Sequence, residues 1–280
     1  MTFTTPSTEG RGKACSSGGL TRQPYPTSAL IDLHSHILPG LDDGSRTVED
    51  ARALARRAAA DGVTAIAATP HVRPDYPTRP DEMERGVIRL REDFVAQRID
   101  VEVLHGGELD LGMLATVGDD ALRRFTLAQS GRYLLLEFPY SGWPAGLEEM
   151  VYGLGLRGFV AIVAHPERNR AVQSDPGRLA DAVRLGALVQ VTAASLDGRI
   201  GRSSQKAATR LLELSLVHLL ASDAHTPEIR EAGLADAAEA VGDDALARFL
   251  TVDAPAAIVA GEALPERPPR ARRRRWHLLF

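Results

Sequence analysis

Two histidines separated by one residue follow a short apolar run near the start of the chain. Ile31-Asp32-Leu33 leads into His34-Ser35-His36, and the loop that follows contains Asp42 and Asp43. On a β-strand, residues i and i+2 point to the same face, so the two imidazoles can converge on one point. Two histidines need this geometry to share a metal ion. A complete site would need further ligands from distant parts of the chain.

Such ligands follow the ends of later apolar runs. They are His71, Glu108, Glu137, His165, Asp223 and His225. A single histidine at a strand end is more often a hydrogen-bonded structural residue, but five of the eight histidines occupy such positions. In a (β/α) barrel the carboxyl ends of all strands form one rim, where residues far apart in sequence meet. The joint pattern therefore favours a site for several metal ions.

The elements that must position these residues alternate between short apolar runs and amphipathic segments. The pattern predicts strands over Leu30–Leu33, Val63–Thr69, Val101–His105, Tyr133–Phe138, Phe159–Ala164, Leu188–Thr192 and Val217–Ser222. It predicts helices over Thr47–Asp61, Pro80–Gln97, Pro144–Leu156, Ser174–Leu185 and Ser203–Leu214, with closing helices in Glu228–Gly261. Strands that alternate with helices indicate an α/β fold with parallel strands. A (β/α) barrel is expected, and a doubly wound open sheet is the alternative.

Composition limits the class of protein. The 280 residues, 44% apolar and 25% charged, suit a globular chain with a full core. No apolar run is long enough to span a membrane, and no signal peptide is evident. Cys15 is the only cysteine, which fits a reducing compartment. We therefore expect a cytoplasmic protein.

The two ends differ from the rest of the chain. Residues 1–28 are rich in Ser, Thr, Gly and Pro and are expected to form a disordered leader. One domain is expected over 29–264, followed by a basic, disordered tail over 265–280. Six arginines lie between 267 and 275, and the rest of the chain holds 27 basic against 37 acidic residues. We expect no nucleic-acid partner; weak contact with a membrane surface through this arginine-rich tail is the remaining option.

With these positions in hand, the chain resembles the polymerase-and-histidinol-phosphatase (PHP) superfamily. Within it, the chain is similar to the bacterial manganese-dependent protein-tyrosine phosphatases of capsule and exopolysaccharide gene clusters. The most specific motifs are Leu38-Pro39-Gly40-Leu41-Asp42-Asp43-Gly44 and His165-Pro166-Glu167-Arg168-Asn169. The others are Asp32-Leu33-His34-Ser35-His36, Ala68-Thr69-Pro70-His71, Gly106-Gly107-Glu108, Leu136-Glu137-Phe138-Pro139, Val191-Thr192-Ala193-Ala194-Ser195-Leu196 and Ala221-Ser222-Asp223-Ala224-His225.

The resemblance implies a distorted (β/α)7 TIM-like barrel, the PHP fold, with three divalent ions. One ion would take His34, His36, Glu137 and Asp223, with Glu137 bridging to a second ion. Asp43, His71, Glu108, His165 and His225 would complete the other two. Arg168 and Arg230 match arginines that hold the phosphate. Mn²⁺ is the expected ion, and the mixed histidine and carboxylate ligands also suit Fe or Zn²⁺.

The resemblance further implies hydrolysis of phosphotyrosine on a protein, expected to be a tyrosine autokinase that regulates capsule or exopolysaccharide synthesis. Clustered metal ions lower the pKa of bound water, so hydroxide can attack phosphorus directly. A cysteine phosphatase is excluded because no Cys-x5-Arg loop exists.

Alternatives remain open. One is a PHP phosphoesterase for histidinol phosphate or another small phosphomonoester, another is an amidohydrolase, and a third is a non-catalytic binding protein. The segment Val72–Pro77 departs from the family pattern beside the site, which leaves substrate preference open.

Overall fold

The computed structural model describes Met1, residues 29–225 and residues 233–269. The predicted leader after Met1, Arg230 and the last eleven residues of the tail lie outside the described residues. Arg267, the first tail arginine, is described, and its guanidinium donates a hydrogen bond to the backbone oxygen of Val217.

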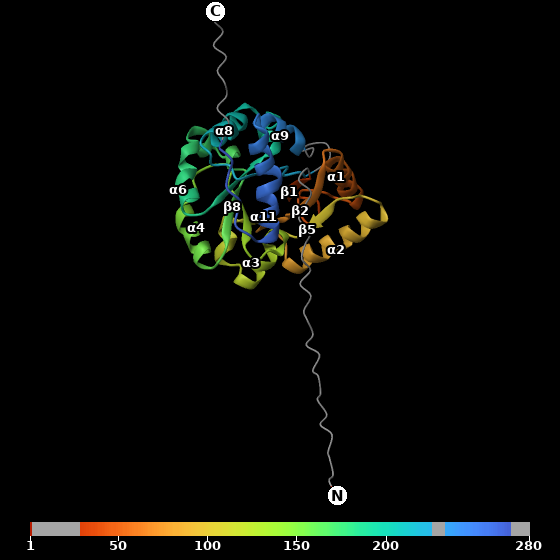
Figure 1. Ribbon diagram of the computed structural model, residues 1–280. Helices are drawn as coiled ribbons and strands as arrows, with labels where there is room; N and C mark the ends of the chain where they lie inside the picture. Colours follow the sequence, from red (N-terminus) through yellow and green to blue (C-terminus); the bar gives the residue numbers. More distant parts are fainter. Residues whose placement is uncertain (2–28, 226–232, 270–280) are drawn as a thin grey trace, which may run out of the picture.

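The elements alternate along the chain as the sequence predicts (Figure 1). The strands are β1 (Leu30–Ser35), β2 (Val63–Ala68), β3 (His71–Arg73), β4 (Tyr76–Pro77), β5 (Glu102–Leu104), β6 (Glu108–Asp110), β7 (Tyr133–Glu137), β8 (Val160–Ala164), β9 (Leu188–Thr192) and β10 (Leu219–Ala221). The α-helices are α1 (Val48–Ala60), α2 (Pro80–Ala96), α3 (Asp119–Phe125), α4 (Leu147–Leu156), α5 (Arg170–Ser174), α6 (Leu179–Arg184), α7 (Ala193–Leu196), α8 (Arg202–Glu213), α9 (Leu234–Val241), α10 (Asp244–Arg248) and α11 (Ala254–Ala260). Short 3₁₀ turns are η1 (Leu111–Ala115), η2 (Leu127–Gln129), η3 (Pro166–Arg168) and η4 (Pro176–Arg178), and η5 (Phe249–Asp253) is a π-helical turn.

The strands form a distorted barrel. Two sheets have the orders β1-β2-β5 and β10-β9-β8-β7-β6-β3-β4, parallel except for the β3–β4 pair. The barrel closes between its first and last strands, where Asp223 N–H donates to the His34 oxygen at 2.9 Å and His36 N–H to the Ala224 oxygen at 2.8 Å. This closure excludes the open sheet and confirms the predicted fold class.

Two interruptions divide the barrel wall into those two sheets. The second strand breaks at Thr69-Pro70 and resumes as β3, and the third breaks between Leu104 and Glu108 and resumes as β6. The Glu108 N–H donates to the Pro70 oxygen at 3.0 Å, so the two resumed strands stay joined. Each interruption places a site residue, His71 or Glu108, at the start of a new strand on the rim.

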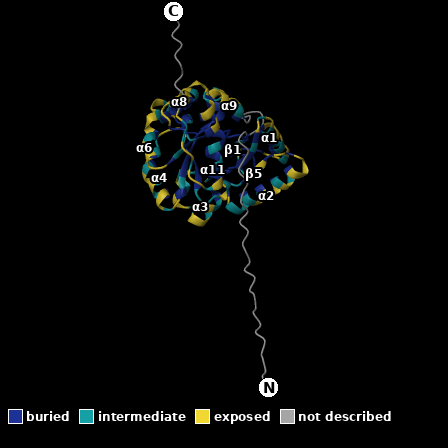
Figure 2. Ribbon diagram, in the orientation of Figure 1, coloured by how far each residue is buried: buried dark blue, intermediate teal, exposed yellow. Residues whose placement is uncertain are grey.

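Apolar side chains fill two layers. One cluster lines the barrel interior and includes Ile31, Leu135, Ile162 and Leu219, with Ile258 of α11 packed against it. A larger cluster fills the space between the strands and the outer helices. Figure 2 shows buried strands inside a shell of half-exposed helices. The strands are thus buried on both faces, as parallel barrel strands require.

Local sequence signals explain several helix ends. Thr47 caps α1 in a capping box with Asp50, and α2 begins at Pro80, as predicted. The predicted helix over Ser174–Leu185 is wrong in its first half, because Asp175 caps the 3₁₀ turn at Pro176 and α6 begins only at Leu179. Helix α4 begins at Leu147 rather than Pro144, because Gly146 takes a left-handed conformation at its N-cap. The hairpin of β3 and β4 was not predicted.

No helix of the described ranges is both long enough and apolar enough to cross a membrane.

Candidate metal centre

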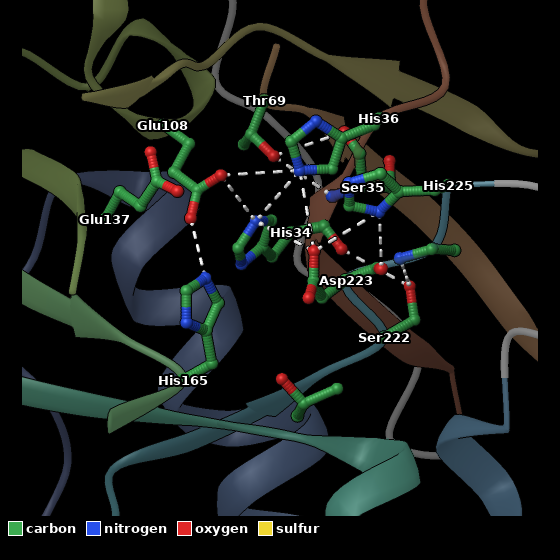
Figure 3. A network of polar contacts seen from close by, with 12 residues as sticks. His34, Ser35, His36, Thr69, Glu108, Glu137, His165, Ser222, Asp223 and His225 are labelled. Carbon is green, nitrogen blue, oxygen red and sulfur yellow. Dashed lines mark hydrogen bonds and ion pairs between the residues drawn. The ribbon is translucent and has the colours of Figure 1, made fainter. Parts of the chain in front are cut away.

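The predicted site residues meet at the carboxyl ends of the barrel strands. Figure 3 shows His34 and His36 facing Glu108 and Asp223, with His165 below Glu108 and joined to it by a dashed line. His34, His36, Glu108, His165 and Asp223 are almost fully buried. Within the described ranges, three groups could hold a metal ion: His36, Asp43, His71 and His225; His34, His36 and Glu108; and His71, Glu108 and Glu137. Within each group, the candidate ligand atoms lie within 4.8 Å of one another.

The histidine pair presents two ring nitrogens to one point. His34 Nδ1 donates to Gln190 Oε1 at 3.0 Å, and His36 Nδ1 donates to Asp42 Oδ2 at 2.7 Å. In a neutral imidazole the other nitrogen then carries a lone pair. These two Nε2 atoms lie only 3.3 Å apart, so either a proton between them or a bound cation is needed to keep two lone pairs from facing each other. A cation between them and the nearby carboxylates would relieve this arrangement.

Glu108 is the central carboxylate. Its Oε2 lies 3.4 Å from Nε2 of both His34 and His36, and 2.9 Å from His71 Nδ1. Its Oε1 is 2.8 Å from His165 Nε2. Glu137 Oε2 and His165 Nδ1 are buried without a hydrogen-bond partner, and Glu108 Oε2 and His71 Nδ1, although 2.9 Å apart, are not aligned for a hydrogen bond. Buried polar atoms are normally satisfied, so these orphaned atoms fit a bound cation.

The grouping differs from the one that the resemblance implied. Glu108, rather than Glu137, lies beside His34 and His36. Glu137 instead lies 3.5 Å from His71 and accepts a 2.9 Å hydrogen bond from Arg73. Glu108 is therefore shared by two of these groups, and a bridging role for Glu137 stays a prediction.

The opposite end of the cluster is more open. Asp43 Oδ1 lies 3.4 Å from Nε2 of both His71 and His225, and the Asp43 side chain is 47% exposed. The interaction with His225 holds the pKa of Asp43 well below its usual range, so its carboxylate is ionised. Among the predicted ligands, Asp43 is thus the one most exposed to solvent.

Backbone geometry is unusual where the strands deliver these residues. His165 and Asp223 have φ values of +37° and +52°. Non-glycine residues rarely adopt such values, and they concentrate at functional sites. The pairing of β1 also shifts register between Asp32 and Ser35, and such irregularities redirect side chains. At Gly44 a Cβ atom would stand 2.2 Å from the His36 oxygen, so this turn requires glycine.

The carboxylates shift the pKa values of the histidines. Burial opposes the charge on His36, but hydrogen bonds to Asp223, Asp42 and Glu108 raise its pKa well above the usual value. Burial lowers the pKa of His165, although Glu108 partly opposes this. Despite its burial, Glu108 has a pKa well below the usual range because histidines surround it. The negative cluster thus attracts positive charge, whether protons or metal ions.

Arg168 lies at the edge of this cluster. Its Nη1 donates to Asp223 Oδ2 at 2.6 Å, and its guanidinium stacks 4.6 Å from the centroid of the Tyr140 ring. The remaining N–H groups leave a planar, permanently charged donor surface. The second predicted arginine, Arg230, lies outside the described residues.

Three residues that hold the ligands were not recognised as such from the sequence. Gln190 Oε1 accepts hydrogen bonds from His34 Nδ1 at 3.0 Å and from the His165 N–H at 3.3 Å. Asp42, adjacent to Asp43, orients His36 and accepts the His71 N–H at 3.0 Å. Asp32 accepts the backbone N–H groups of His34 and Ser222. The available signal was a polar residue inside an apolar strand, at Gln190 and at Asp32.

His218 is separate from this cluster, as predicted. Its Nδ1 accepts the Val189 N–H at 3.1 Å, and burial lowers its pKa to about 4. It is a neutral structural histidine.

Comparisons with known proteins agree with this geometry. The chain is 36% identical to the tyrosine-protein phosphatase YwqE of Bacillus subtilis over 203 residues, which is 72% of this chain and 79% of that protein. It is 32% identical to the putative tyrosine-protein phosphatase CapC of Staphylococcus aureus, over 70% of this chain and 77% of that protein.

A solved structure extends the likeness to three dimensions. It is one of the crystal structures of YwqE from Bacillus subtilis and CpsB from Streptococcus pneumoniae, which are metal-dependent tyrosine phosphatases. It matches with a TM-score of 0.79 and 31% identity, over 88% of this chain and all of that one. The family model for capsular polysaccharide synthesis, CpsB/CapC, matches residues 30–259. The chain belongs to the CpsB/CapC family.

Proposed function

We propose that this chain is a metal-dependent protein-tyrosine phosphatase that acts in capsule or exopolysaccharide synthesis. The observation that carries the proposal is the facing pair of Nε2 atoms on His34 and His36, beside Glu108, with Arg168 at the edge. Family membership and the metal-dependent phosphatases among its relatives support the same activity.

The proposed metal ligands are the nine residues predicted from the sequence: His34, His36, Asp43, His71, Glu108, Glu137, His165, Asp223 and His225. We propose three divalent ions, with Mn²⁺ favoured over Fe or Zn²⁺. When bound, such ions lower the pKa of a coordinated water toward neutrality and neutralise charge on phosphoryl oxygens.

The protein's own side chains would orient these groups. Asp42 and Gln190 hold the His36 and His34 rings with Nε2 toward the cluster, as partners of metal-binding histidines commonly do. Arg168, fixed by Asp223 and Tyr140, would donate charged hydrogen bonds to a phosphate oxygen. Arg230 is proposed to share this role, by resemblance alone.

The substrate is proposed to be phosphotyrosine on a protein, with a tyrosine autokinase as the expected partner. A cytoplasmic location belongs to the same proposal and rests on the single cysteine. Contact of the arginine-rich tail with an anionic membrane surface stays a prediction.

A substrate panel tests the proposed activity. Metal-reconstituted protein should hydrolyse a phosphotyrosyl peptide with a higher kcat/KM than histidinol phosphate, and it should not cleave amide or lactone substrates. A preference for histidinol phosphate would move the chain to the other phosphoesterase class. Amide hydrolysis without phosphatase activity would overturn the proposal.

A further inference from the structure

Two tyrosines stand in matching positions on either side of Glu108. The Tyr76 ring lies nearly parallel to the His71 ring, with centroids 5.9 Å apart and 21° between their planes. The Tyr140 ring lies parallel to the His165 ring, with centroids 6.0 Å apart and 8° between planes. His71 faces one oxygen of Glu108 and His165 faces the other. Each tyrosine therefore lies beyond one histidine of the cluster.

An arginine guanidinium also lies over the ring of each of these tyrosines. The Arg73 guanidinium lies 5.1 Å from the Tyr76 ring centroid and donates to Glu137 at 2.9 Å. The Arg168 guanidinium lies 4.6 Å from the Tyr140 centroid and donates to Asp223 at 2.6 Å. The same sequence of contacts, tyrosine to arginine to cluster carboxylate, thus occurs twice. Cation–π contact and a charged hydrogen bond together fix both rings beside the cluster.

We propose that Tyr76 and Tyr140 are specificity-determining residues that bind the aromatic ring of the substrate and so select aryl phosphates over alkyl phosphates. This inference rests on the proposed phosphatase function. A phosphate bound by Arg168 would bring its ester group close to Tyr140, because the Arg168 guanidinium lies 4.6 Å from the centroid of that ring. An aryl ester offers a flat apolar face that can stack on tyrosine, and an alkyl ester does not.

Tyr140 is expected to contribute more than Tyr76. Tyr140 is 49% exposed, whereas Tyr76 is less exposed. The more exposed ring gains more from stacking, because more of its apolar surface can still be covered. Tyr76 lies in the Val72–Pro77 segment that departs from the family pattern, so it is the natural place for a preference particular to this chain.

The test compares kcat/KM for phenyl phosphate and for O-phosphoserine in the same preparation of metal-loaded protein. Tyr140→Ala should lower the aryl-to-alkyl ratio by about 3- to 10-fold, mostly through a higher KM for phenyl phosphate. Tyr76→Ala should lower it by a smaller factor. Tyr140→Phe retains the ring and should keep the ratio near the wild-type value. Inhibition by inorganic phosphate, which has no ring, should change by less than about 2-fold in all variants.

Tyr152→Ala is the matched control. Tyr152 is 57% exposed on α4, on the outside of the barrel, and its removal should leave the ratio unchanged. Metal content is measured on every variant, and Tyr140→Leu provides a second variant should Tyr140→Ala fold poorly.

Equal loss on both substrates, or an unchanged ratio in both alanine variants, would overturn the inference and leave the phosphatase function standing. A metal-loaded wild-type protein that hydrolyses neither ester would instead remove the proposed function and this inference together.

Discussion

Asp42 Oδ2 lies 2.7 Å from His36 Nδ1, and this contact decides which ring nitrogen of His36 faces the cluster. Although burial opposes ionisation, the hydrogen bonds from His36, Gly44 and His71 keep the pKa of Asp42 below its usual value. An ionised carboxylate only accepts hydrogen bonds, so Nδ1 carries the hydrogen and Nε2 is available to a metal ion.

Asp42→Asn should therefore weaken metal binding. Removing a partner that orients a metal-binding histidine typically lowers affinity about 10- to 100-fold. Competition with a calibrated chelator measures the affinity. Asp181→Asn, at a position 62% exposed on α6, is the matched control and should bind metal like wild type. Unchanged affinity in Asp42→Asn would show that Asp42 does not position His36.

Metal uptake should release protons. The neighbouring carboxylates raise the pKa of His36 well above its usual value in the metal-free protein, so a proton occupies the ring at neutral pH. A metal ion must displace that proton, and apparent affinity should therefore fall as pH falls. Calorimetry in buffers of different ionisation enthalpy counts the protons released. Binding with no proton release at neutral pH would contradict the shifted pKa.

Arg168→Lys should impair phosphate handling without loss of metal. Lysine keeps the charge but lacks the planar fork, and the loss of one charged hydrogen bond costs about 1.5 to 3 kcal/mol, or roughly 10- to 150-fold in kcat/KM. Arg178→Lys is the matched control, because Arg178 also stacks on an aromatic ring, that of Trp143, at 4.4 Å. Near-normal kcat/KM in Arg168→Lys, or lost metal, would refute this role.

Glu167→Gln should change how stability depends on pH. Glu167 Oε1 accepts hydrogen bonds from Ser195 Oγ at 2.6 Å and the Thr192 N–H at 3.1 Å, while burial raises its pKa from 4.5 to about 7. The folded state therefore keeps a proton that the unfolded chain loses between these two pH values. The Glu167 contribution to stability is full below about pH 4.5 and declines as pH rises toward 7, by up to about 3 kcal/mol.

Denaturant unfolding of both proteins across pH 4.5 to 7.5 measures this difference. Because glutamine mimics the neutral acid, the variant should gain stability relative to wild type as pH rises through this window. Parallel pH profiles would show that Glu167 titrates normally.

The alternation of apolar runs and helices was sufficient to predict an α/β fold with parallel strands, because most strands are short and buried on both faces. It left the barrel and the open sheet as alternatives, because barrel closure depends on pairing between the first and last strands. The N-terminal ends of α1 at Thr47 and of α2 at Pro80 were predictable, because helix capping depends on residues that are neighbours in the sequence. The breaks at Thr69-Pro70 and after Leu104 were not, because they depend on pairing between distant strands.

The site was predictable as a set of residue types but not as a set of contacts. His34 and His36 could be recognised from the sequence because their spacing places both side chains on one face of a strand. That Glu108 rather than Glu137 would lie beside them depends on where β6 resumes, which no local pattern encodes. Gln190 and Tyr140 act through partners far away in sequence, so their roles emerge only in the folded chain.

Chelation followed by metal titration tests the central claim most directly. Protein stripped with EDTA and dialysed is assayed on a phosphotyrosyl peptide while Mn²⁺ is added, with bound metal measured in parallel. The stripped protein should show negligible hydrolysis, and activity should rise together with bound metal. His165→Ala should prevent this recovery. Full activity in stripped protein with no bound metal would contradict metal-dependent hydrolysis.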